Sequence, residues 1–222
     1  ANGSVIRAAL VAAADGRGSK AREAAGIGVD RKDYGQSALT FTIAHSEPHH
    51  GQAEEHFLSG GVLAVLPLTG NRSSIVWADT AARALDLMAM AVEDFTATFH
   101  HVLGPHLGHI ALESQRNSYP LALQIARELV SPRLALVGDA AHVIHPLAGL
   151  GLNLGFKDAA ALSEVLADAS AIGEDIGSVS VLEQYAQKRR FDTVSTTYAL
   201  DAMNSLFANA NPLLTLIRGL GL

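Results

Sequence analysis

The stretch RLALVGDAAHVIHPLAGLGLNLGFKDAAAL, residues 133–162, decides the expected fold of this chain. It begins with a short apolar run, residues 133–138, that is typical of a strand buried on both faces. Gly138-Asp139 closes that run, and a loop with two histidines, one proline and closely spaced glycines follows. Residues 153–167 then have the apolar spacing of a helix. This order predicts a strand, a glycine-rich loop and a helix that begins where the loop ends.

Asp139 has the chemistry of a binding residue. A carboxylate at the end of a buried strand needs hydrogen-bond donors to remain charged. The hydroxyl groups of a bound sugar or sugar alcohol would supply such donors. An aspartate after a glycine is also a common turn former or helix cap, so the dipeptide alone leaves both interpretations open.

Three glycines mark the expected start of the helix. Gly149, Gly151 and Gly155 permit backbone torsions and close approaches that a side chain would block. The free N–H groups and the positive dipole end of a helix favour an electron-rich ligand group. The spacing G-x-G-x-x-x-G differs from the G-x-G-x-x-G of a dinucleotide fingerprint. Joined to the preceding strand and Asp139, the glycines indicate a site for the polar part of a cofactor.

The composition narrows the class of protein. The 222 residues carry a formal charge of −6 and no basic stripe, which argues against nucleic-acid binding. The chain has no cysteine, so disulfides, zinc–thiolate sites and thiol catalysis are excluded. The 49% of apolar and 17% of charged residues predict extensive burial or a surface that a partner covers.

The histidines raise the question of a metal site. Neither of two groups in the sequence has the H-E-x-x-H spacing or a cysteine partner, and adjacent histidines on a helix point apart. We therefore predict no metal site. The two groups are His45, His49, His50 and His56, and His100, His101, His106 and His109.

The first third of the chain predicts an α/β element followed by a sheet. Residues 4–14 have the pattern of a mostly buried strand. Ser19 suits a helix N-cap, and Gly26 suits the position just past the end of a short helix. Residues 34–77 hold short β-rich runs separated by Pro, Gly and Asn, which is typical of an antiparallel sheet.

Helices are expected in the rest of the chain. Residues 179–210 predict a long helix, and residues 211–222 predict a last one. Residues 81–103 predict one helix with an inward apolar face, made of Leu85, Met88, Val92, Phe95 and Phe99.

Several motifs together resemble one enzyme family. The run GDAAHVIHPLAGLGLNLGFKDAAAL, residues 138–162, resembles the second FAD-binding motif of the flavoprotein aromatic hydroxylases. VAAADGRGSKAREAAGI, residues 11–27, looks like that family's Asp-Gly motif. DYGQSALT, SYPLAL, GEDIGS and the final LFANANPLLTLIRGLGL are similar to the ubiquinone-biosynthesis hydroxylases. The resemblance covers essentially the whole chain, and the motifs follow in the family's order.

The resemblance implies which residues contact FAD. Asp139 would hydrogen-bond the ribityl chain, and the loop from Pro146 to Asn153 would lie along the isoalloxazine ring. Asp15 and Gly16 would lie near the pyrophosphate. The full implied set of FAD-binding residues is Asp15, Gly16, Arg17, Gly138, Asp139, Pro146, Gly149, Leu150, Gly151, Leu152 and Asn153.

Some residues of this set carry open questions. Leu150 stands where the family usually has Gln, so a polar contact to the flavin is in doubt. Arg17 is either an electrostatic helper or an exposed surface residue. His145 and Pro146 are the candidates near the reacting part of the flavin, although His142 and His145 are equally expected as structural hydrogen-bonding residues.

The implied fold is α/β (α+β), with an incomplete Rossmann-like FAD-binding domain, an inserted antiparallel β-sheet substrate domain and C-terminal helices. The expected parts are residues 1–32 and 131–177 for the FAD-binding domain, 33–130 for the substrate domain and 178–222 for the C-terminal helices. The family's G-x-G-x-x-G turn does not occur in the sequence. We therefore expect a fragment of a longer enzyme that binds FAD weakly or not at all and is inactive by itself.

The implied activity of the whole enzyme is ring hydroxylation of a polyprenylated phenol in ubiquinone biosynthesis, with FAD as cofactor, NADH or NADPH as co-substrate and O2. The alternatives are a flavin hydroxylase of a small soluble phenol and a noncatalytic interaction module that keeps the fold. The expected location is cytoplasmic, peripheral at the inner membrane, because the substrate dissolves there. A homo-oligomer and association with other ubiquinone-biosynthesis enzymes are further expectations.

Overall fold

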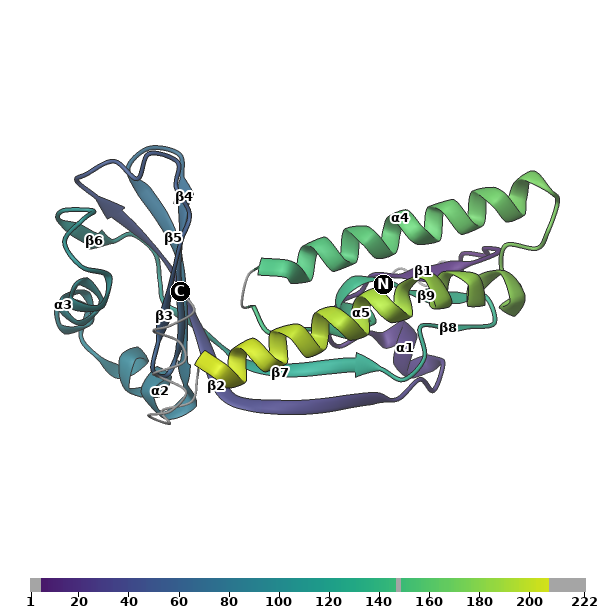
Figure 1. Ribbon diagram of the computed structural model, residues 1–222, viewed down its shortest axis with the longest axis horizontal. Helices are drawn as coiled ribbons and strands as arrows, with labels where there is room; N and C mark the ends of the chain where they lie inside the picture. The colour runs from purple at the N-terminus through teal and green to yellow at the C-terminus, as the bar shows by residue number, and fades with distance from the viewer. Residues whose placement is uncertain (1–4, 147–148, 208–222) are drawn as a thin grey trace. The chain divides into compact units, whose positions relative to one another are not determined.

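The computed structural model describes residues 5–146 and 149–207, with side chains up to residue 196. The chain divides into two compact units: one takes in residues 1–32 and 122–202, and the other takes in residues 33–121 and 203–222. Two strands, β2 (Val29–His45) and β7 (Asn117–Ala126), each continue from one unit into the other (Figure 1).

The first unit is built on a small sheet in the order β1-β9-β8. Its short elements are β1 (Val11–Ala13), α1 (Lys20–Ala24), β8 (Val130–Ser131), β9 (Leu134–Leu136), the 3-10 helix η1 (Gly138–Ala140) and β10 (His142–Val143). β1 and β9 are parallel, with Ala13 paired to Leu136, and β8 is antiparallel to β9. β10 pairs antiparallel with the last residues of β7.

Two long helices complete this unit, α4 (Leu150–Ala171) and α5 (Val179–Phe207). They lie side by side in Figure 1, and their apolar sides share one buried cluster. The hydroxyl of Tyr185 on α5 also donates a 2.7 Å hydrogen bond to the carbonyl oxygen of Leu136 in β9. The helix pair is therefore tied directly to the sheet. The fully described members of the cluster are Val130, Ala135, Leu162, Val165, Ala169, Val181, Leu182 and Tyr185.

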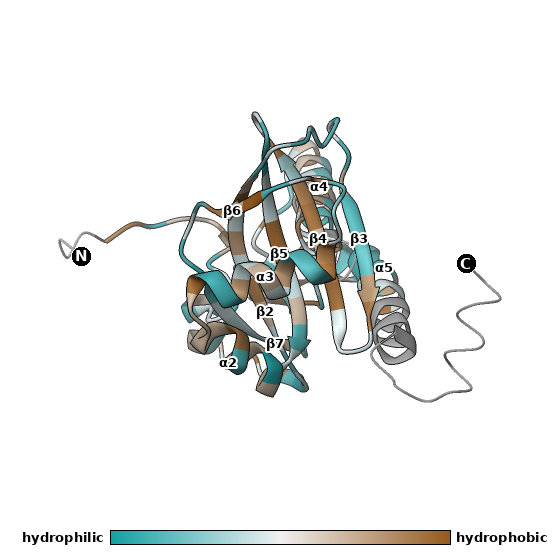
Figure 2. Ribbon diagram, turned by 90° about the vertical axis from the view of Figure 1, so that its left-hand side faces the viewer, coloured by the Kyte–Doolittle hydropathy of each residue, from teal (hydrophilic) through white to brown (hydrophobic). Residues whose placement is uncertain are grey.

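The second unit contains an antiparallel sheet in the order β2-β5-β4-β3, and β6 pairs with β2. Its other elements are β3 (Glu54–Leu58), β4 (Gly61–Leu68), β5 (Arg72–Thr80), α2 (Ala81–Ala89), α3 (Val92–Leu103) and β6 (Ile110–Leu112). Most of β4 is apolar, as its brown ribbon in Figure 2 shows.

The core of the second unit lies between this sheet and α2 and α3, which cover one of its faces in Figure 1. Phe41 contacts both Phe95 and Phe99 edge-on, with ring centroids 5.1 Å apart in each pair. Trp77, the only tryptophan in the sequence, is buried against the same two rings. Burial of these rings is the main apolar contribution to the stability of this unit.

Several predicted elements are confirmed. Ser19 caps α1 through a 3.0 Å hydrogen bond from the backbone N–H of Arg22, and Gly26 has φ 71° just past the helix end. The β-rich runs between residues 34 and 77 form antiparallel strands. The helices expected at 153–167 and 179–210 are α4 and α5, over the residues that the structure describes. The last predicted helix, 211–222, lies outside the described residues.

The two strands predicted at residues 4–14 and 133–138 are both shorter in the structure. Residues 5–10 are not in a strand, and Val5 and Ile6 are 86% and 90% exposed. The run from Arg133 to Gly138 holds only the three-residue strand β9. Arg133 has φ 61° and Gly138 has φ 60°. These left-handed residues end β9 on both sides. The parallel pairing of β1 with β9 is therefore only three residues long.

The single helix predicted for residues 81–103 is broken in two, and the prediction for its inward face is partly wrong. Met90 has an extended backbone with φ −64° and ψ 146°. Phe95 and Phe99 are buried as predicted, whereas Leu85 is 71% exposed and Val92 is exposed. The break shifts the helical phase, so the face inferred from α3 does not extend back into α2.

Arg116 stabilises the break. Its guanidinium donates 2.9 Å hydrogen bonds to the carbonyl oxygens of Leu87 and Met90 at the end of α2. It also lies over the ring of Phe95, 4.6 Å from the centroid. Helix carbonyls that would otherwise lack partners are thus satisfied by a residue that follows β6 in the chain. Among the described residues, no helix combines the length and apolar character needed to span a bilayer.

Candidate functional site

The carboxyl ends of β1 and β9 bring two predicted motifs to one edge of a sheet. β1 ends two residues before Asp15, and β9 ends two residues before Gly138. The backbone N–H of Val137 donates a 2.9 Å hydrogen bond to the carbonyl oxygen of Ala13, so the strands leave the sheet together. In α/β sheets, ligands bind outside the carboxyl ends of parallel strands. This edge is therefore the candidate cofactor site.

A buried arginine, Arg22, joins the two motifs. Its Nη1 donates a 2.8 Å hydrogen bond to the carbonyl oxygen of Ala140, and its Nη2 donates one of 2.9 Å to that of Arg17. Gln124 Nε2 donates to the same Arg17 oxygen at 3.0 Å. The side chain of Arg17, which the sequence proposed as a helper, is exposed. Sequence reasoning missed Arg22 because nothing in its neighbourhood marks a buried cation.

Asp15 closes the turn before α1. Its carboxylate accepts hydrogen bonds from the backbone N–H groups of Lys20 at 2.8 Å and Ala21 at 3.2 Å. Hydrogen bonds from Ser19 and from these backbone groups hold the pKa of Asp15 below its ordinary value. Gly16 follows with φ 84°, a torsion that favours glycine. The charged motif is thus held in one geometry by its own helix.

Asp139 lies in the turn that follows β9. Gly138 adopts φ 60° and starts η1, and the next residue, Asp139, is exposed. Within the described part of the chain, its carboxylate has no hydrogen-bond partner. A carboxylate held at a strand end and left free of protein donors is suited to bind hydroxyl groups of a ligand.

The N-terminus of α4 also lacks protein partners among the described residues. Gly149, with φ 59°, is the N-cap and has no side chain to accept from the first N–H groups. The first turn contains no acidic residue. The helix therefore presents free N–H groups and its positive dipole end to an electron-rich ligand group.

The glycines of this loop have different roles. A Cβ added at Gly151 would meet nothing closer than Ile144, at 3.9 Å. Packing within the described chain therefore does not require glycine at 151, but close approach of a ligand would. A Cβ at Gly155 would lie 3.4 Å from the Cα of Gly138. Gly155 thus belongs to the contact between α4 and η1.

The other predicted loop residues surround this helix start. Leu152 is 69% exposed, Asn153 is exposed, and Leu150 and Pro146 are half-buried. Residues 147 and 148 lie outside the described residues. His145 is almost fully buried, so its ring is part of the packing beneath the loop.

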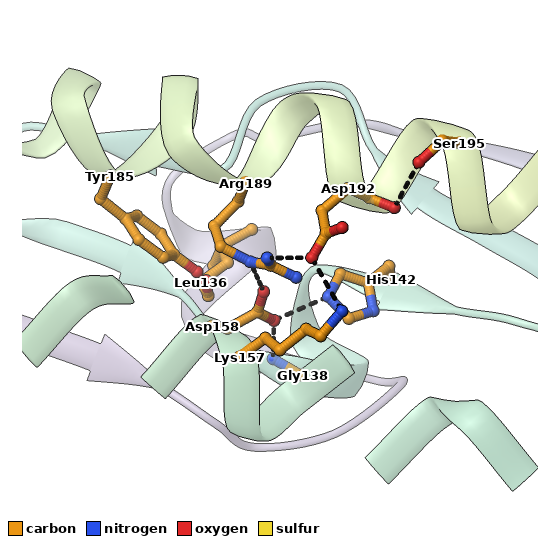
Figure 3. Close-up of polar contacts among 9 residues, drawn as sticks. All are labelled: Leu136, Gly138, His142, Lys157, Asp158, Tyr185, Arg189, Asp192 and Ser195. Carbon is orange, nitrogen blue, oxygen red and sulfur yellow. Dashed lines mark hydrogen bonds and ion pairs between the residues drawn. The ribbon is translucent and has the colours of Figure 1, made fainter. Parts of the chain in front are cut away.

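A buried polar network supports the turn from below (Figure 3). Asp158 on α4 is 1% exposed, and its Oδ2 accepts hydrogen bonds from the backbone N–H of Gly138 at 2.9 Å and from His142 Nε2 at 2.7 Å. Its Oδ1 accepts from Arg189 Nε at 2.6 Å. His142 is thus a structural hydrogen-bonding residue, one of the two roles that the sequence left open.

The charges of this network are balanced. Burial alone would raise the pKa of Asp158, but hydrogen bonds from His142, Arg189 and Gly138 outweigh it and hold that pKa below its ordinary value. Arg189 also donates to Asp192 at 2.8 Å, and Lys157 pairs with the same Asp192 oxygen at 3.2 Å. The carboxylate of Asp158 is therefore ionised and paired in the folded chain. Sequence reasoning missed Asp158 and Arg189, although Asp158 stands inside the motif it quoted.

Several of the remaining histidines make local contacts. In the second unit, Glu54 Oε2 lies 3.0 Å from Nε2 of both His56 and His106. His49 Nε2 contacts the carbonyl oxygens of Leu68 and Gly70, each at 2.9 Å. Across the described residues, no group of three or more His, Cys, Asp or Glu is arranged to hold a metal ion.

These features fit FAD. A free carboxylate at a strand end suits the ribityl hydroxyls, and the uncapped helix start suits the electron-rich edge of the flavin. Gly151 leaves open space beside that helix start. The donors and acceptors of this edge thus match those that the cofactor needs.

The fold is that of FAD-dependent monooxygenases. The crystal structure of pqsL, a probable FAD-dependent monooxygenase from Pseudomonas aeruginosa, matches with a TM-score of 0.72 at 23% identity, over 93% of this chain and 57% of that one. That of p-nitrophenol 4-monooxygenase PnpA from Pseudomonas putida matches with a TM-score of 0.71 at 21% identity, over 94% of this chain and 52% of that one. At these identities the likeness shows the fold alone.

The family described as FAD binding domain matches residues 2–195, and the chain belongs to that family. Ubiquinone hydroxylase UbiL of Rhodospirillum rubrum is 44% identical over 100% of this chain and 52% of its own length. The 3-demethoxyubiquinol 3-hydroxylase of Escherichia coli is 39% identical over 99% of this chain and 56% of its own length. The chain thus spans about half the length of these curated relatives.

Proposed function

We propose that the protein carrying this chain is an FAD-dependent monooxygenase that hydroxylates the aromatic ring of a polyprenylated phenol in ubiquinone biosynthesis, with NADH or NADPH and O2. One observation supports this most. In a chain of the FAD-binding family, the η1 turn packs on α4, and among the described residues neither the Asp139 carboxylate in that turn nor the start of α4 has a side-chain partner. Both relatives are named as hydroxylases of ubiquinone or a ubiquinol precursor, which supports the substrate class. They do not favour hydroxylation of a small soluble phenol or a noncatalytic module.

The proposed roles follow from the observed geometry. Asp139 accepts hydrogen bonds from the ribityl hydroxyls. The N–H groups at Leu150, Gly151 and Leu152, in the first turn of α4, would hold the electron-rich edge of the flavin, and the helix dipole would favour negative charge there. Pro146, before α4, and Asn153, in its first turn, would border the ring.

The remaining predicted residues have lesser parts. Asp15 and Gly16 shape the turn near the pyrophosphate, and the carbonyl oxygen of Arg17 anchors that turn to Arg22. The bound flavin supplies the redox and oxygen chemistry. The chain supplies position, electrostatics and exclusion of water. His145 acts by packing beneath the loop.

The proposal is tested on the protein at its natural length. The purified protein should show the absorption spectrum of bound flavin. Asp139→Ala should lose most of the bound FAD, because no other described carboxylate takes its place in that turn. Asp168→Asn, on the exposed side of α4, should keep it. Full FAD content in the Asp139→Ala protein would refute the role of that carboxylate.

The activity needs a second measurement. Oxidation of NADH and NADPH should be stimulated by a polyprenyl phenol, and the product should contain one added oxygen from O2. Stimulation by small soluble phenols alone would contradict the proposed substrate class.

The proposed location follows from the substrate. A polyprenyl phenol dissolves in the bilayer, so we propose peripheral attachment of the protein at the inner membrane, with association with other enzymes of the same biosynthesis or with a second copy. Co-sedimentation with vesicles that contain the phenol tests the attachment, and a protein that stays in the supernatant at every lipid concentration would contradict it.

A further inference from the structure

We propose that Asp158 is a positioning residue for flavin binding: it aims Asp139 by holding the residues on both sides of it. The inference rests on the proposed role of Asp139 at the ribityl chain. Asp158 lies on α4, twenty residues after Gly138, and among the described residues its carboxylate hydrogen-bonds no member of the predicted FAD-binding set except Gly138.

The geometry of the carboxylate carries this inference (Figure 3). One oxygen, Oδ2, binds the N–H of Gly138, directly before Asp139, and Nε2 of His142, three residues after Asp139. The exposed Asp139 is therefore the projecting part of a loop whose two ends are bonded to the same buried atom. Rotation of that loop requires both hydrogen bonds to break.

The conformation of Gly138 makes the loop dependent on this anchor. Its φ of 60° is a left-handed torsion, which sets the direction in which Asp139 leaves the strand. Glycine alone has wide conformational freedom and would not hold this torsion. Two hydrogen bonds hold it: one from its N–H to Asp158, and one of 2.8 Å from the N–H of Ala141 to its carbonyl oxygen.

The position of Asp158 is itself set from the other side. Its Oδ1 accepts a 2.6 Å hydrogen bond from Arg189 on α5, and Arg189 is 4% exposed. The same guanidinium binds Asp192 at 2.8 Å. A buried ion pair with such additional hydrogen bonds has one low-energy geometry. Asp158 thus transmits the packing of α4 on α5 to the flavin-binding turn.

His142 contributes a second observation. Its Nε2 faces Asp158, so its Nδ1 faces away from the carboxylate, and in the described part of the chain this buried atom has no partner. Among the described residues, Asp158 is therefore the only hydrogen-bond partner of the ring. Loss of that carboxylate would free the ring and the N–H of Gly138, while the pairing of β10 with β7 would still hold the backbone at His142.

The test is a double-mutant cycle on FAD affinity in the protein at its natural length, stripped of flavin and titrated with FAD by fluorescence quenching. Asp158→Asn keeps the shape of the side chain and removes its charge. It should raise the FAD dissociation constant roughly tenfold, in the range that one charged hydrogen bond contributes. The visible circular dichroism of its bound flavin should also differ from that of the unmodified protein. The matched control is Asp168→Asn, an exposed acid on the same helix, which should change neither.

Asp139→Ala supplies the second arm of the cycle. Because Asp158 acts through Asp139, Asp158→Asn should add less than roughly a threefold loss of affinity when Asp139 is already alanine. An equal loss in both backgrounds would mean a general structural role and would overturn the inference. Normal affinity in Asp158→Asn would also overturn it.

Two further outcomes are separable. If Asp139→Ala loses FAD but Asp158→Asn does not, the inference fails and the proposed function stands. If Asp139→Ala binds FAD normally, the inference and the role of Asp139 both fail, and the proposed activity is decided by the oxidation assay. If Asp158→Asn does not fold, Arg189→Lys replaces it in the cycle. That variant keeps a cation beside Asp158 but changes the hydrogen bonds, and it should show a smaller loss with the same dependence on Asp139.

Discussion

Arg22 Nη1 donates a 2.8 Å hydrogen bond to the carbonyl oxygen of Ala140, 118 residues further along the chain. Arg22 is 5% exposed and Ala140 is fully buried. This contact joins the turn after β1 to the turn after β9, which are the two motifs at the candidate FAD site. The cofactor edge is therefore a joint product of distant segments.

Replacement of Arg22 tests the importance of that contact. Arg22→Met should lower the free energy of unfolding by about 2–3 kcal/mol, because two carbonyl oxygens, those of Ala140 and Arg17, lose their charged donor. Urea unfolding at neutral pH measures the change. Arg31→Met, at an exposed position in β2, is the matched control and should change stability by less than about 0.5 kcal/mol. Equal stability of the two variants would contradict the assigned role.

The glycines of the site should separate stability from FAD binding. Gly151→Ala should keep or raise the stability of the flavin-free protein, by up to about 1 kcal/mol, since the new Cβ meets only Ile144 at 3.9 Å and alanine favours a helix. It should nevertheless weaken FAD binding, because the methyl group fills the space beside the helix start.

Gly138→Ala should instead lower both the stability of the flavin-free protein and its affinity for FAD, because its torsion also sets the direction of Asp139. Its φ of 60° imposes a cost of about 1–2 kcal/mol on any residue with a Cβ. Thermal unfolding without FAD, followed by FAD titration, measures both effects. A Gly151→Ala protein that binds FAD with unchanged affinity would contradict the placement of the flavin at α4.

The acid stability of the first unit should depend on Asp158. Its pKa in the folded chain is held below the ordinary value of about 4, so the charged form favours folding. That contribution is present above the unfolded pKa and is lost as the pH falls through the folded pKa. The gap in unfolding free energy between the unmodified protein and Asp158→Asn should therefore be largest at pH 5–7 and shrink below about pH 4. A gap of the same size at pH 3 would contradict this.

The core of the second unit should be sensitive at α3 and tolerant at α2. Phe99→Ala should destabilise by about 3–5 kcal/mol, because the ring is buried against Phe41 and Trp77. Leu85→Ala should cost less than about 0.5 kcal/mol, because Leu85 is 71% exposed. Trp77 fluorescence during urea unfolding reports both variants. A large loss of stability in Leu85→Ala would contradict the exposed position of Leu85 and favour the inward face that the sequence predicted.

Local signals in the sequence were reliable where the physics is local. The Ser19 cap, the Gly26 end and the antiparallel strands within residues 34–77 depend on near neighbours, and the structure confirms them. The prediction that Leu85 faces inward was wrong because the helix breaks at Met90. That break is stabilised by Arg116, which lies 26 residues away. The length of the first strand was wrong because a strand extends only as far as its partner does.

The sequence by itself determined the type of cofactor site: a Gly-Asp pair after a buried strand, a glycine loop and a helix start, in an order that matches the FAD-binding family. Only the tertiary structure decided how that site is held. Arg22, Asp158 and Arg189 are charged residues that a sequence pattern assigns to the surface, and their burial follows from partners 31 to 118 residues away or on another helix. A buried charge is stable only beside its partner, and that pairing exists only in the folded chain.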